Sequence, residues 1–321
     1  MVNEWFLIIN SYAGAGKARK YLTEIFRLIK DAGIHFTHRF TDYKGHGISL
    51  IQEAIKNGWR SIICIGGDGT INEAVNGIFS QNSVPTTDIT LAMIPVGVGI
   101  DWGKTIGIPS NYIDAIRVIK QGITYIQDVG LVKYYNLDKP QKRYFVNIAG
   151  IGYDALVTEK ANYMKKQGHS GTIPYLLSLL SCLIRYKYKM VKLKIDKHEL
   201  EGKAFSINVG ICKYSGGGMM QVPDAIPDDG FFDITFIKDV GKLDIIKNVN
   251  NLYDGTFIQH PKIETFRCRK ISIHSHPKIF LEVDGESLGH SPLYFEIIPK
   301  SVKVVVEKHK RVWQSHISPS P

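Results

Sequence analysis

A glycine-rich turn that carries one carboxylate follows an apolar run in the first third of the chain. The run Ile62–Ile65 predicts a buried strand, and GGDGT occupies residues 66–70 directly after it. Three glycines in four positions allow a turn whose backbone amides point inward and bind an anion. Because Asp68 would repel a bare phosphate, the turn predicts a phosphate bound together with a cation. The alternative is a tight strand-to-helix turn with a surface carboxylate, since turns of this composition are common.

The residues after the turn predict a helix that adds to this anion site. Thr70 and Glu73 have the spacing of a capping box, so we expect the helix to start at Thr70. The N-terminus of that helix would place the positive end of its dipole beside the turn.

Similar chemistry occurs in segments before and after this turn. NSYAGAGK at residues 10–17 follows an apolar strand, but it lacks the Gly at position 11 and the Ser or Thr at position 18 that a Walker A loop needs. PVGVGIDW at residues 95–102 also follows a strand, and its Asp101 could face the same cation as Asp68. His46 is a lone histidine, and such residues are more often structural than in contact with a ligand.

The elements that position these turns alternate between strand and helix over about the first 120 residues. That alternation favours a parallel sheet with helices on both faces. Each glycine turn follows a predicted strand, and ligands of such sheets bind at the carboxyl ends of the strands. We therefore predict an α/β nucleotide-binding domain over residues 1–124. The segment at about 300–316 is a candidate to return to it.

The pattern changes after Gly122, where short strands with turn signals replace the alternation. Many short strands favour a mostly antiparallel β-sandwich, which we assign to residues 125–299 as the substrate domain. Helices are expected there over residues 155–164 and 173–186. The basic segment 185–194, RYKYKMVKLK, predicts an edge strand protected by lysines. The alternative for this segment is a patch that faces a membrane.

Two acidic segments of the second half could carry chemistry. PDAIPDDG at residues 223–230 follows three glycines at 216–218, and it could hold a hard cation through carboxylate and backbone oxygens. Most acidic turns of this kind are simple hairpin loops. EVDGE at residues 282–286 contains an Asp-Gly pair that is typical of a type I′ hairpin tip.

The composition narrows the classes of protein to which the chain can belong. Its 44% apolar and 22% charged residues are typical of a folded chain, and no apolar segment approaches the roughly 20 residues that span a bilayer. Its scattered cysteines predict reduced thiols in a cytoplasmic protein, and we expect no signal peptide. The net charge of +10 favours polyanionic partners, of which nucleic acid ranks last because no nucleic-acid motif is present.

Taken together, these segments resemble the diacylglycerol kinase catalytic-domain family of bacterial lipid kinases. GGDGTINEAVNG at residues 66–77 fits the family signature GGDGTxNEVxNG almost throughout. GGDGT also occurs in kinases of NAD and of sphingosine, and the later GGG, DDG and DGE segments make the resemblance more specific. It covers about residues 5–300. The other matching segments are residues 10–16, 41–46, 95–109, 147–154, 216–233 and 284–286.

The resemblance implies an ATP-dependent kinase that phosphorylates the hydroxyl of a diacylglycerol-like lipid, with an NAD-kinase-like fold for the first domain. Glu286 would take or orient the hydroxyl proton, and Asp68 would be the second catalytic residue. The implied partners are ATP, the lipid and an anionic membrane surface at the inner face of the membrane, with a homodimer as an expected assembly. The implied nucleotide-binding residues are Asn10, Gly14, Thr41, Gly45, His46, Gly66, Gly67, Asp68, Gly69, Thr70, Glu73, Gly97, Val98 and Asp101.

The resemblance also implies Mg²⁺ as a cofactor at two places. Asp68, Asp101 and Asp229 would form a magnesium network. A structural magnesium would sit on the acidic turn and bind the Asp229 carboxylate with the backbone carbonyls of Ile226 and Phe231.

Ser11 replaces the usual Pro of the family's first segment, and a second departure bears on nucleotide binding. Val98 stands where the family has Thr, and Ile100 stands where it has Asn. Val offers no hydroxyl, and one hydrogen bond to a charged group is worth roughly 1.5–3 kcal/mol. We therefore predict an enzyme whose nucleotide binding is weakened or differently tuned. The alternatives are a non-catalytic nucleotide or lipid sensor and a kinase of a sphingoid or other non-diacylglycerol alcohol.

Overall fold

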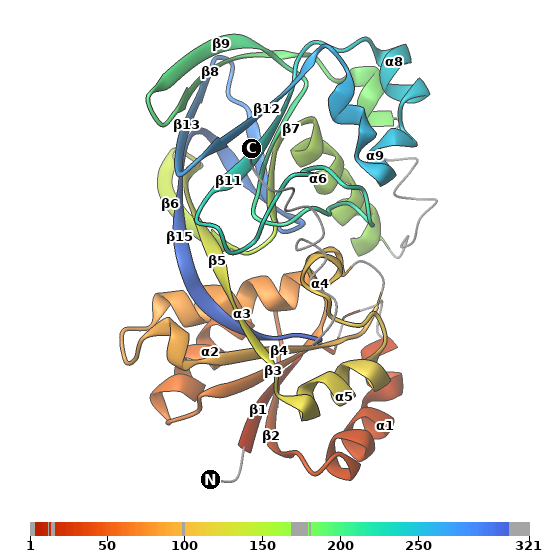
Figure 1. Cartoon of the computed structure of the whole chain (residues 1–321), viewed down its shortest axis with the longest axis vertical. Coiled ribbons are helices and arrows are strands. Elements are labelled where there is room, and N and C mark those ends of the chain that lie inside the picture. Colours follow the sequence, from red (N-terminus) through yellow and green to blue (C-terminus); the bar gives the residue numbers. More distant parts are fainter. Residues whose placement is uncertain are drawn as a thin grey trace, which may run out of the picture. The chain divides into compact units, whose positions relative to one another are not determined.

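The computed structural model describes residues 4–11, 13, 17–97, 100–167, 179 and 181–307 of the 321-residue chain. The chain divides into two compact units, which Figure 1 shows with their elements labelled. The first unit runs to Asp128 and resumes at Lys300, and the second unit is Val129–Pro299. The strands β5 (Thr124–Asn136) and β15 (Glu286–Val305) each begin in one unit and end in the other.

The first unit is built on a parallel sheet with strand order β2-β1-β3-β4, and the end of β15 joins β4 in parallel. Strands β1, β3 and β4 are buried at every position after the first. Continuous apolar strands of this kind are typical of a parallel sheet that helices cover on both faces. The predicted α/β class is therefore confirmed. The strands are β1 (Glu4–Ile9), β2 (His35–Phe40), β3 (Ser61–Gly66) and β4 (Thr90–Pro95).

The helices of the first unit follow the predicted alternation, with one difference at the central turn. Helix α3 begins at Asp68 with Gly67 as its N-cap, so the predicted start at Thr70 is wrong by two residues. The short helix α4, at the end of the 95–102 segment, was not predicted. Full burial of Ile25 and Ile29 on α1 anchors that helix to the core. The helices are α1 (Lys17–Asp31), α2 (His46–Lys56), α3 (Asp68–Ser80), α4 (Asp101–Ile106) and α5 (Tyr112–Gln121), with a 3₁₀ turn at Thr86–Asp88.

The second unit is an antiparallel β-sandwich, as predicted. One row of strands has the order β12-β11-β10-β7-β14-β15, and a second row, β9-β8-β13-β15-β5-β6, shares the long strand β15. Nine neighbouring pairs of strands in these two rows are antiparallel. The remaining strands are β6 (Lys139–Phe145), β7 (Ile148–Gly152), β8 (Lys189–Ile195), β9 (His198–Ala204), β10 (Ser206–Gly210), β11 (Phe232–Ile237), β12 (Ile263–Cys268), β13 (Lys270–Ser275) and β14 (Phe280–Val283).

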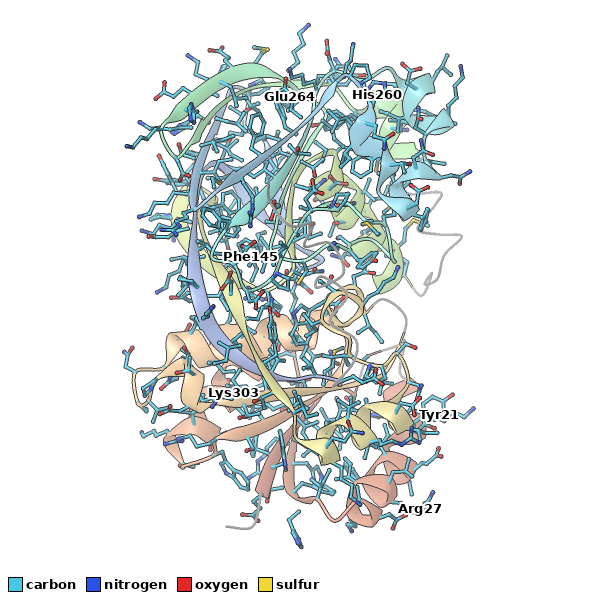
Figure 2. The ribbon with its side chains drawn as sticks, viewed as in Figure 1. Tyr21, Arg27, Phe145, His260, Glu264 and Lys303 are labelled. Atoms are coloured by element: carbon cyan, nitrogen blue, oxygen red, sulfur yellow. The ribbon has the colours of Figure 1, made fainter. Side chains whose placement is uncertain are left out.

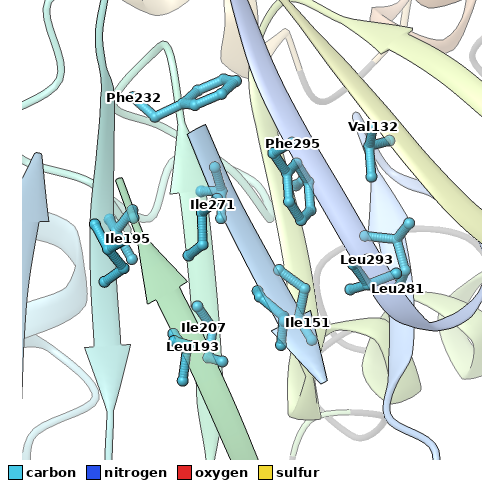
Figure 3. Packing of buried hydrophobic residues seen from close by; sticks show 14 of the residues in the cluster. Val132, Ile151, Leu193, Ile195, Ile207, Phe232, Ile271, Leu281, Leu293 and Phe295 are labelled. Atoms are coloured by element: carbon cyan, nitrogen blue, oxygen red, sulfur yellow. The ribbon is translucent and has the colours of Figure 1, made fainter. Parts of the chain in front are cut away.

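The core of the sandwich lies between its two rows of strands (Figure 3). Phe145 stacks on Phe232 with ring centroids 5.7 Å apart, and Phe295 meets Phe145 edge-on at 6.2 Å. The three rings come from β6, β11 and β15, which are far apart in the sequence. Offset and edge-to-face pairs add about 0.5–1.5 kcal/mol each beyond the apolar area they bury, so this aromatic group helps to fix the packing of the strands.

The helices of the second unit lie on one side of this sheet, and two of them were not predicted. Helix α6 (Tyr153–Lys166) contains the predicted segment 155–164, whereas most of the predicted helix 173–186 lies outside the described residues, which are helical at 179 and 181–185. Helices α8 (Lys242–Lys247) and α9 (Asn251–Asp254) and the 3₁₀ turn Thr256–Gln259 follow β11. No helix among the described residues is long and apolar enough to cross a membrane.

The basic segment 185–194 is not an edge strand, so that prediction is wrong. Strand β8 pairs with β13 on one side and with β9 on the other. Lys192 and Lys194 lie 3.4 Å from the carboxylates of Glu201 and Glu199 on β9. These two lysines therefore face acidic partners on the neighbouring strand. Arg185 and Lys187 precede β8 and are not part of this paired strand.

Candidate active site

The loops after β1 and β3 meet at the start of α3. The Asn10 side chain donates to the Thr70 hydroxyl at 3.4 Å, and the Asn10 backbone N–H donates to the Ile65 carbonyl at 3.1 Å. A Cβ at Gly66 would lie 2.2 Å from the Thr70 hydroxyl oxygen, so only glycine permits this approach of strand end and helix. The structure thus brings together three of the predicted nucleotide-binding residues, with Gly67 and Gly69 beside them at the N-terminus of α3.

Glu73 connects α3 to the loop after β2. Its two carboxylate oxygens accept hydrogen bonds from the backbone N–H groups of Gly45 at 2.7 Å and Gly47 at 2.8 Å. A Cβ at Gly47 would lie 2.6 Å from one of these oxygens. The predicted capping box with Thr70 is therefore wrong, because Glu73 satisfies free N–H groups at the start of α2 instead of those of its own helix.

Asp68 and Asp101 lie together at the ends of the neighbouring strands β3 and β4. The Asp101 backbone N–H, at the start of α4, donates to the Asp68 carboxylate at 3.0 Å. Helix α4 is held in turn by Trp102, whose indole N–H donates to the Gln127 side chain at 3.0 Å. Asp68 therefore positions the loop that carries Asp101. Carboxylate oxygens are hard ligands that magnesium prefers, so these two residues are the candidates of the first unit to hold such an ion. Gly97, with φ of 119°, turns the chain between β4 and α4.

A groove of about 610 Å³ lies beside these loops in the first unit. Thr41, which is buried directly after β2, lines it together with Ser11 and Arg19. His46 does not line this groove. Its ring stacks on Tyr43 at 4.6 Å, and its Nδ1 accepts from the Asp42 backbone N–H at 3.1 Å, which is the structural use expected of a lone histidine. Arg19 is a cation beside this groove that the sequence motifs did not indicate.

The Asp-Gly-Glu segment of the second unit forms the tip of the β14–β15 hairpin. Val283 pairs with Glu286, and the two residues between them, Asp284 and Gly285, have φ of 47° and 80°. Two central residues with positive φ define a type I′ turn, which confirms the predicted hairpin. The Asp284 carboxylate accepts from the backbone N–H groups of residues 146 and 147 at 3.2 and 3.1 Å. Asp284 therefore fixes the turn, and Glu286 is left half-buried at the start of β15.

A buried carboxylate, Glu282, and a half-buried one, Asp154, lie behind this turn. Glu282, on β14, is 2% exposed, and its carboxylate accepts from the Gly285 backbone N–H at 2.9 Å. Burial raises the pKa of Glu282 well above its usual value, and the neighbouring Asp154 carboxylate raises it further. Burial also raises the pKa of Asp154, against hydrogen bonds from Ser206, Asn208 and Gln221. A Cβ at Gly150 would lie 2.6 Å from the Glu282 carboxylate and 2.9 Å from the Asp154 Cβ, so this glycine lets the two side chains approach.

Asp154 forms one end of an apolar cavity of about 140 Å³ within the second unit. Asn208 and Gln221 share that end; they are 2% and 6% exposed, and their side-chain oxygens have no hydrogen-bond partner among the described residues. The walls come from α6, the helical residues near 183, β10, β11 and α8–α9, and His260, which Figure 2 labels, is also part of the lining. The apolar wall includes Leu179, Leu183, Phe205, Val240, Ile245 and Leu252.

The comparisons with known proteins place these sites in a family. Residues 4–132 match the family described as the diacylglycerol kinase catalytic domain, and residues 147–306 match the one described as the YegS C-terminal NAD kinase beta sandwich-like domain. The chain belongs to the diacylglycerol kinase catalytic-domain family.

Curated relatives and solved structures of this family align along nearly the whole chain. The diacylglycerol kinase of Staphylococcus haemolyticus is 28% identical over 94% of this chain and 88% of that one. The diacylglycerol kinase of Bacillus subtilis is 27% identical over 95% of this chain and 96% of that one. A crystal structure of a diacylglycerol kinase from Bacillus anthracis shares the fold, with a TM-score of 0.70 over 95% of this chain and 97% of that one, at 23% identity.

The acidic turn that is expected to bind magnesium in this family already contains a cation of the protein. One Asp229 oxygen accepts from the Phe231 backbone N–H at 3.0 Å, and the other pairs with the Arg267 guanidinium. Arg267 also reaches Asp233 at 3.4 Å and lies over the Phe231 ring at 4.9 Å. No group of three or more His, Cys, Asp or Glu side chains gathers around a metal position in the described part of the chain. These contacts do not fit a magnesium on Asp229, Ile226 and Phe231.

Some predicted site residues lie outside this description. Gly14 and Val98 are not among the described residues. The sequence did not single out Asn208 and Gln221, because they belong to no motif and become polar neighbours of Asp154 only when β10 and the 216–233 segment meet α6.

Proposed function

We propose that the chain transfers the γ-phosphoryl group of ATP to the hydroxyl of a diacylglycerol-like lipid at the inner face of a membrane. The observation that carries the proposal is the cavity of the second unit. It is apolar along its walls and polar at Asp154, and Asp154 neighbours Glu282, which bonds to the turn that carries Glu286. A lipid chain in this cavity would bring its polar end toward Glu286.

The first unit supports the nucleotide site of the proposal. Backbone N–H groups at the start of α3 and the positive end of its dipole favour phosphate oxygens. Asp68 and Asp101 would hold the magnesium of a bound nucleotide, and that ion neutralises phosphate charge during transfer. Thr41 and Arg19 offer a hydroxyl and a cation in the neighbouring groove.

In the proposed reaction the lipid hydroxyl oxygen forms a bond to the γ-phosphorus, and the bond from that phosphorus to the oxygen bridging the β- and γ-phosphates breaks. The hydroxyl proton goes to the Glu286 carboxylate, and ADP leaves. A carboxylate is a weak base for an alcohol, so the main contribution of Glu286 is to orient the hydroxyl. Phosphoryl transfer depends chiefly on such positioning and on charge neutralisation.

One observation favours an alternative acceptor, a sphingoid or other amino alcohol. The partnerless oxygens of Asn208 and Gln221 are hydrogen-bond acceptors, so they would bind a donor on the ligand. Diacylglycerol has one hydroxyl, whereas a sphingoid base has an additional hydroxyl and an amine. Comparing transfer to diacylglycerol, ceramide and sphingosine decides between the acceptors.

The test of the cavity assignment is a substitution that fills it. Val249→Phe places a ring in the lining, and Val249→Ala is the matched variant that only removes volume. We expect Val249→Phe to raise the KM for long-chain diacylglycerol in mixed micelles and to leave the KM for ATP unchanged. Unchanged KM values for the lipid in both variants would show that the acceptor binds elsewhere.

A further inference from the structure

Large apolar side chains are exposed on the helices that cover the cavity. Ile184 is 75% exposed, Leu243 is 72%, Tyr253 is 52% and Ile246 is 48%. The first belongs to the helical residues 181–185, the others to α8 and α9, and these elements lie together in Figure 1. We call these four side chains the apolar rim. A group of exposed apolar side chains on adjacent elements marks an interaction surface.

Contacts within the second unit show that the rim is one surface. The Lys242 ammonium, at the start of α8, donates to the Ile184 carbonyl at 2.6 Å. This bond joins α8 to the end of the helical residues 181–185. Ile246 is half-exposed and also lines the cavity, so the rim reaches the edge of the cavity itself.

Helix α8 has the side-chain pattern of a helix that lies on a bilayer. Its outer face carries Leu243 and Ile246, while Ile245 packs inward with the cluster around the cavity. Lys242 and Lys247 stand at its two ends, and lysines in such places keep their charge in water while their stems cover apolar surface. An apolar outer face flanked by lysines is typical of interfacial helices.

The charges around the rim favour an anionic surface. Arg185 and Lys187 are exposed directly after Ile184, whereas the lysines of β8 at 192 and 194 face glutamates of β9. With Lys242 and Lys247 of α8, the segments that carry the rim hold four cations, against the two carboxylates of Asp244 and Asp254. A local excess of positive charge agrees with the net charge of +10 and attracts anionic lipids.

We propose that the apolar rim docks on an anionic lipid bilayer and that the acceptor lipid enters the cavity past Ile246. This proposal rests on the proposed function in one respect only, namely that the cavity takes the acceptor lipid. Docking itself is independent of phosphoryl transfer. The rim residues Ile184 and Leu243 do not line the cavity, so they can be changed without altering it.

The test compares two double variants by sedimentation with vesicles of phosphatidylcholine and phosphatidylglycerol. Ile184→Gln/Leu243→Gln removes two rim side chains. Ile113→Gln/Leu137→Asn removes two side chains that are 48% and 87% exposed elsewhere, and it is the matched control. We expect the rim variant to bind the vesicles at least about tenfold more weakly than the wild type, since each buried Leu or Ile contributes about a tenfold factor or more. The control should bind as the wild type does.

Two further measurements separate docking from catalysis. Transfer to long-chain diacylglycerol in the vesicles should fall with vesicle binding in the rim variant, while transfer to a short-chain, monomeric diacylglycerol should not change. If the wild type phosphorylates neither lipid, the proposed function fails, and vesicle binding still decides the docking proposal.

Equal vesicle binding by the wild type and the rim variant overturns the docking proposal, as does a control variant whose vesicle binding is weakened as much as that of the rim variant. A rim variant that changes a dimer to a monomer in light scattering, with vesicle binding intact, assigns the rim to a second copy of the chain and also overturns it.

Discussion

Glu73 offers a direct test of how the loops of the first unit are held. Its carboxylate accepts two backbone hydrogen bonds, from Gly45 at 2.7 Å and Gly47 at 2.8 Å. A hydrogen bond to a charged group is worth about 1.5–3 kcal/mol, and a neutral one about 0.5–1.5 kcal/mol. Glu73→Gln keeps one acceptor oxygen and loses the charge. The expected loss in free energy of unfolding is therefore about 2–4 kcal/mol.

The assay for this prediction uses tryptophan fluorescence during urea unfolding. The described tryptophans, Trp5, Trp59 and Trp102, all lie in the first unit, so their fluorescence reports on that unit. With a typical urea dependence of about 2 kcal/mol per molar, the midpoint should fall by about 1–2 M. The KM for ATP should also rise, because the loop before α2 carries predicted nucleotide-binding residues.

Two variants control the measurement. Glu53→Gln makes the same chemical change at an exposed position of α2, and it should change the free energy of unfolding by less than about 0.5 kcal/mol. Gly47→Ala would place a Cβ 2.6 Å from the Glu73 carboxylate and should disturb the same contact. The loss in free energy of unfolding in the double variant Gly47→Ala/Glu73→Gln should therefore be smaller than the sum of the losses in the two single variants. Equal midpoints for Glu73→Gln and Glu53→Gln would refute the assigned role.

The remaining predictions concern nucleotide affinity, pH and metal. Val98→Thr/Ile100→Asn should raise ATP affinity by about tenfold to a hundredfold if it restores one hydrogen bond to a charged group, and an unchanged Kd would show that the loop is not limiting. Burial in the folded state raises the pKa of Glu282, so the folded protein binds the carboxyl proton more tightly than the unfolded chain does. This proton binding stabilises the fold fully below about pH 4.5, and the stabilisation is lost as the pH rises through the pKa of the folded state. Glu282→Gln should make the urea midpoint followed by circular dichroism less dependent on pH, and an unchanged slope would contradict this. Because Arg267 pairs with Asp229, removing metal with EDTA should leave the Tm of the wild type unchanged. Adding Mg²⁺ should raise the Tm of the Arg267→Gln variant, in which Asp229 has lost this partner. A wild-type Tm that falls with EDTA would instead support a structural magnesium on the acidic turn.

The sequence predicted the first unit well because its signals are local and agree with one another. The apolar runs of β1, β3 and β4 each lead into a segment that contains glycine, and this combination specifies a parallel sheet with loops at its carboxyl edge. Glu73 was misassigned because the capping-box spacing is also local, whereas its true partners, Gly45 and Gly47, are 26–28 residues away. A tertiary contact thus displaced a local one.

Other features could not be predicted because they depend on pairing or on the outer face of an element. Strand β8 alternates lysine with apolar residues and has the pattern of an edge, yet the glutamates of β9 compensate its lysines. Helix α8 was missed because its outer face is apolar, which hides the usual contrast between a buried and a solvated side. The cavity has no sequence signature, since its lining comes from separate segments between residues 153 and 263.

The most direct test of the central claim is transfer of labelled γ-phosphate from ATP, with magnesium, to diacylglycerol in mixed micelles. Glu286→Gln and Asp68→Asn are the variants, and Asn at position 68 keeps an acceptor for the Asp101 N–H. The account predicts labelled lipid with the wild type and a loss of label in both variants, with ATP binding retained in Glu286→Gln. Absence of label in diacylglycerol, ceramide and sphingosine while ATP still binds would contradict it and favour a non-catalytic sensor.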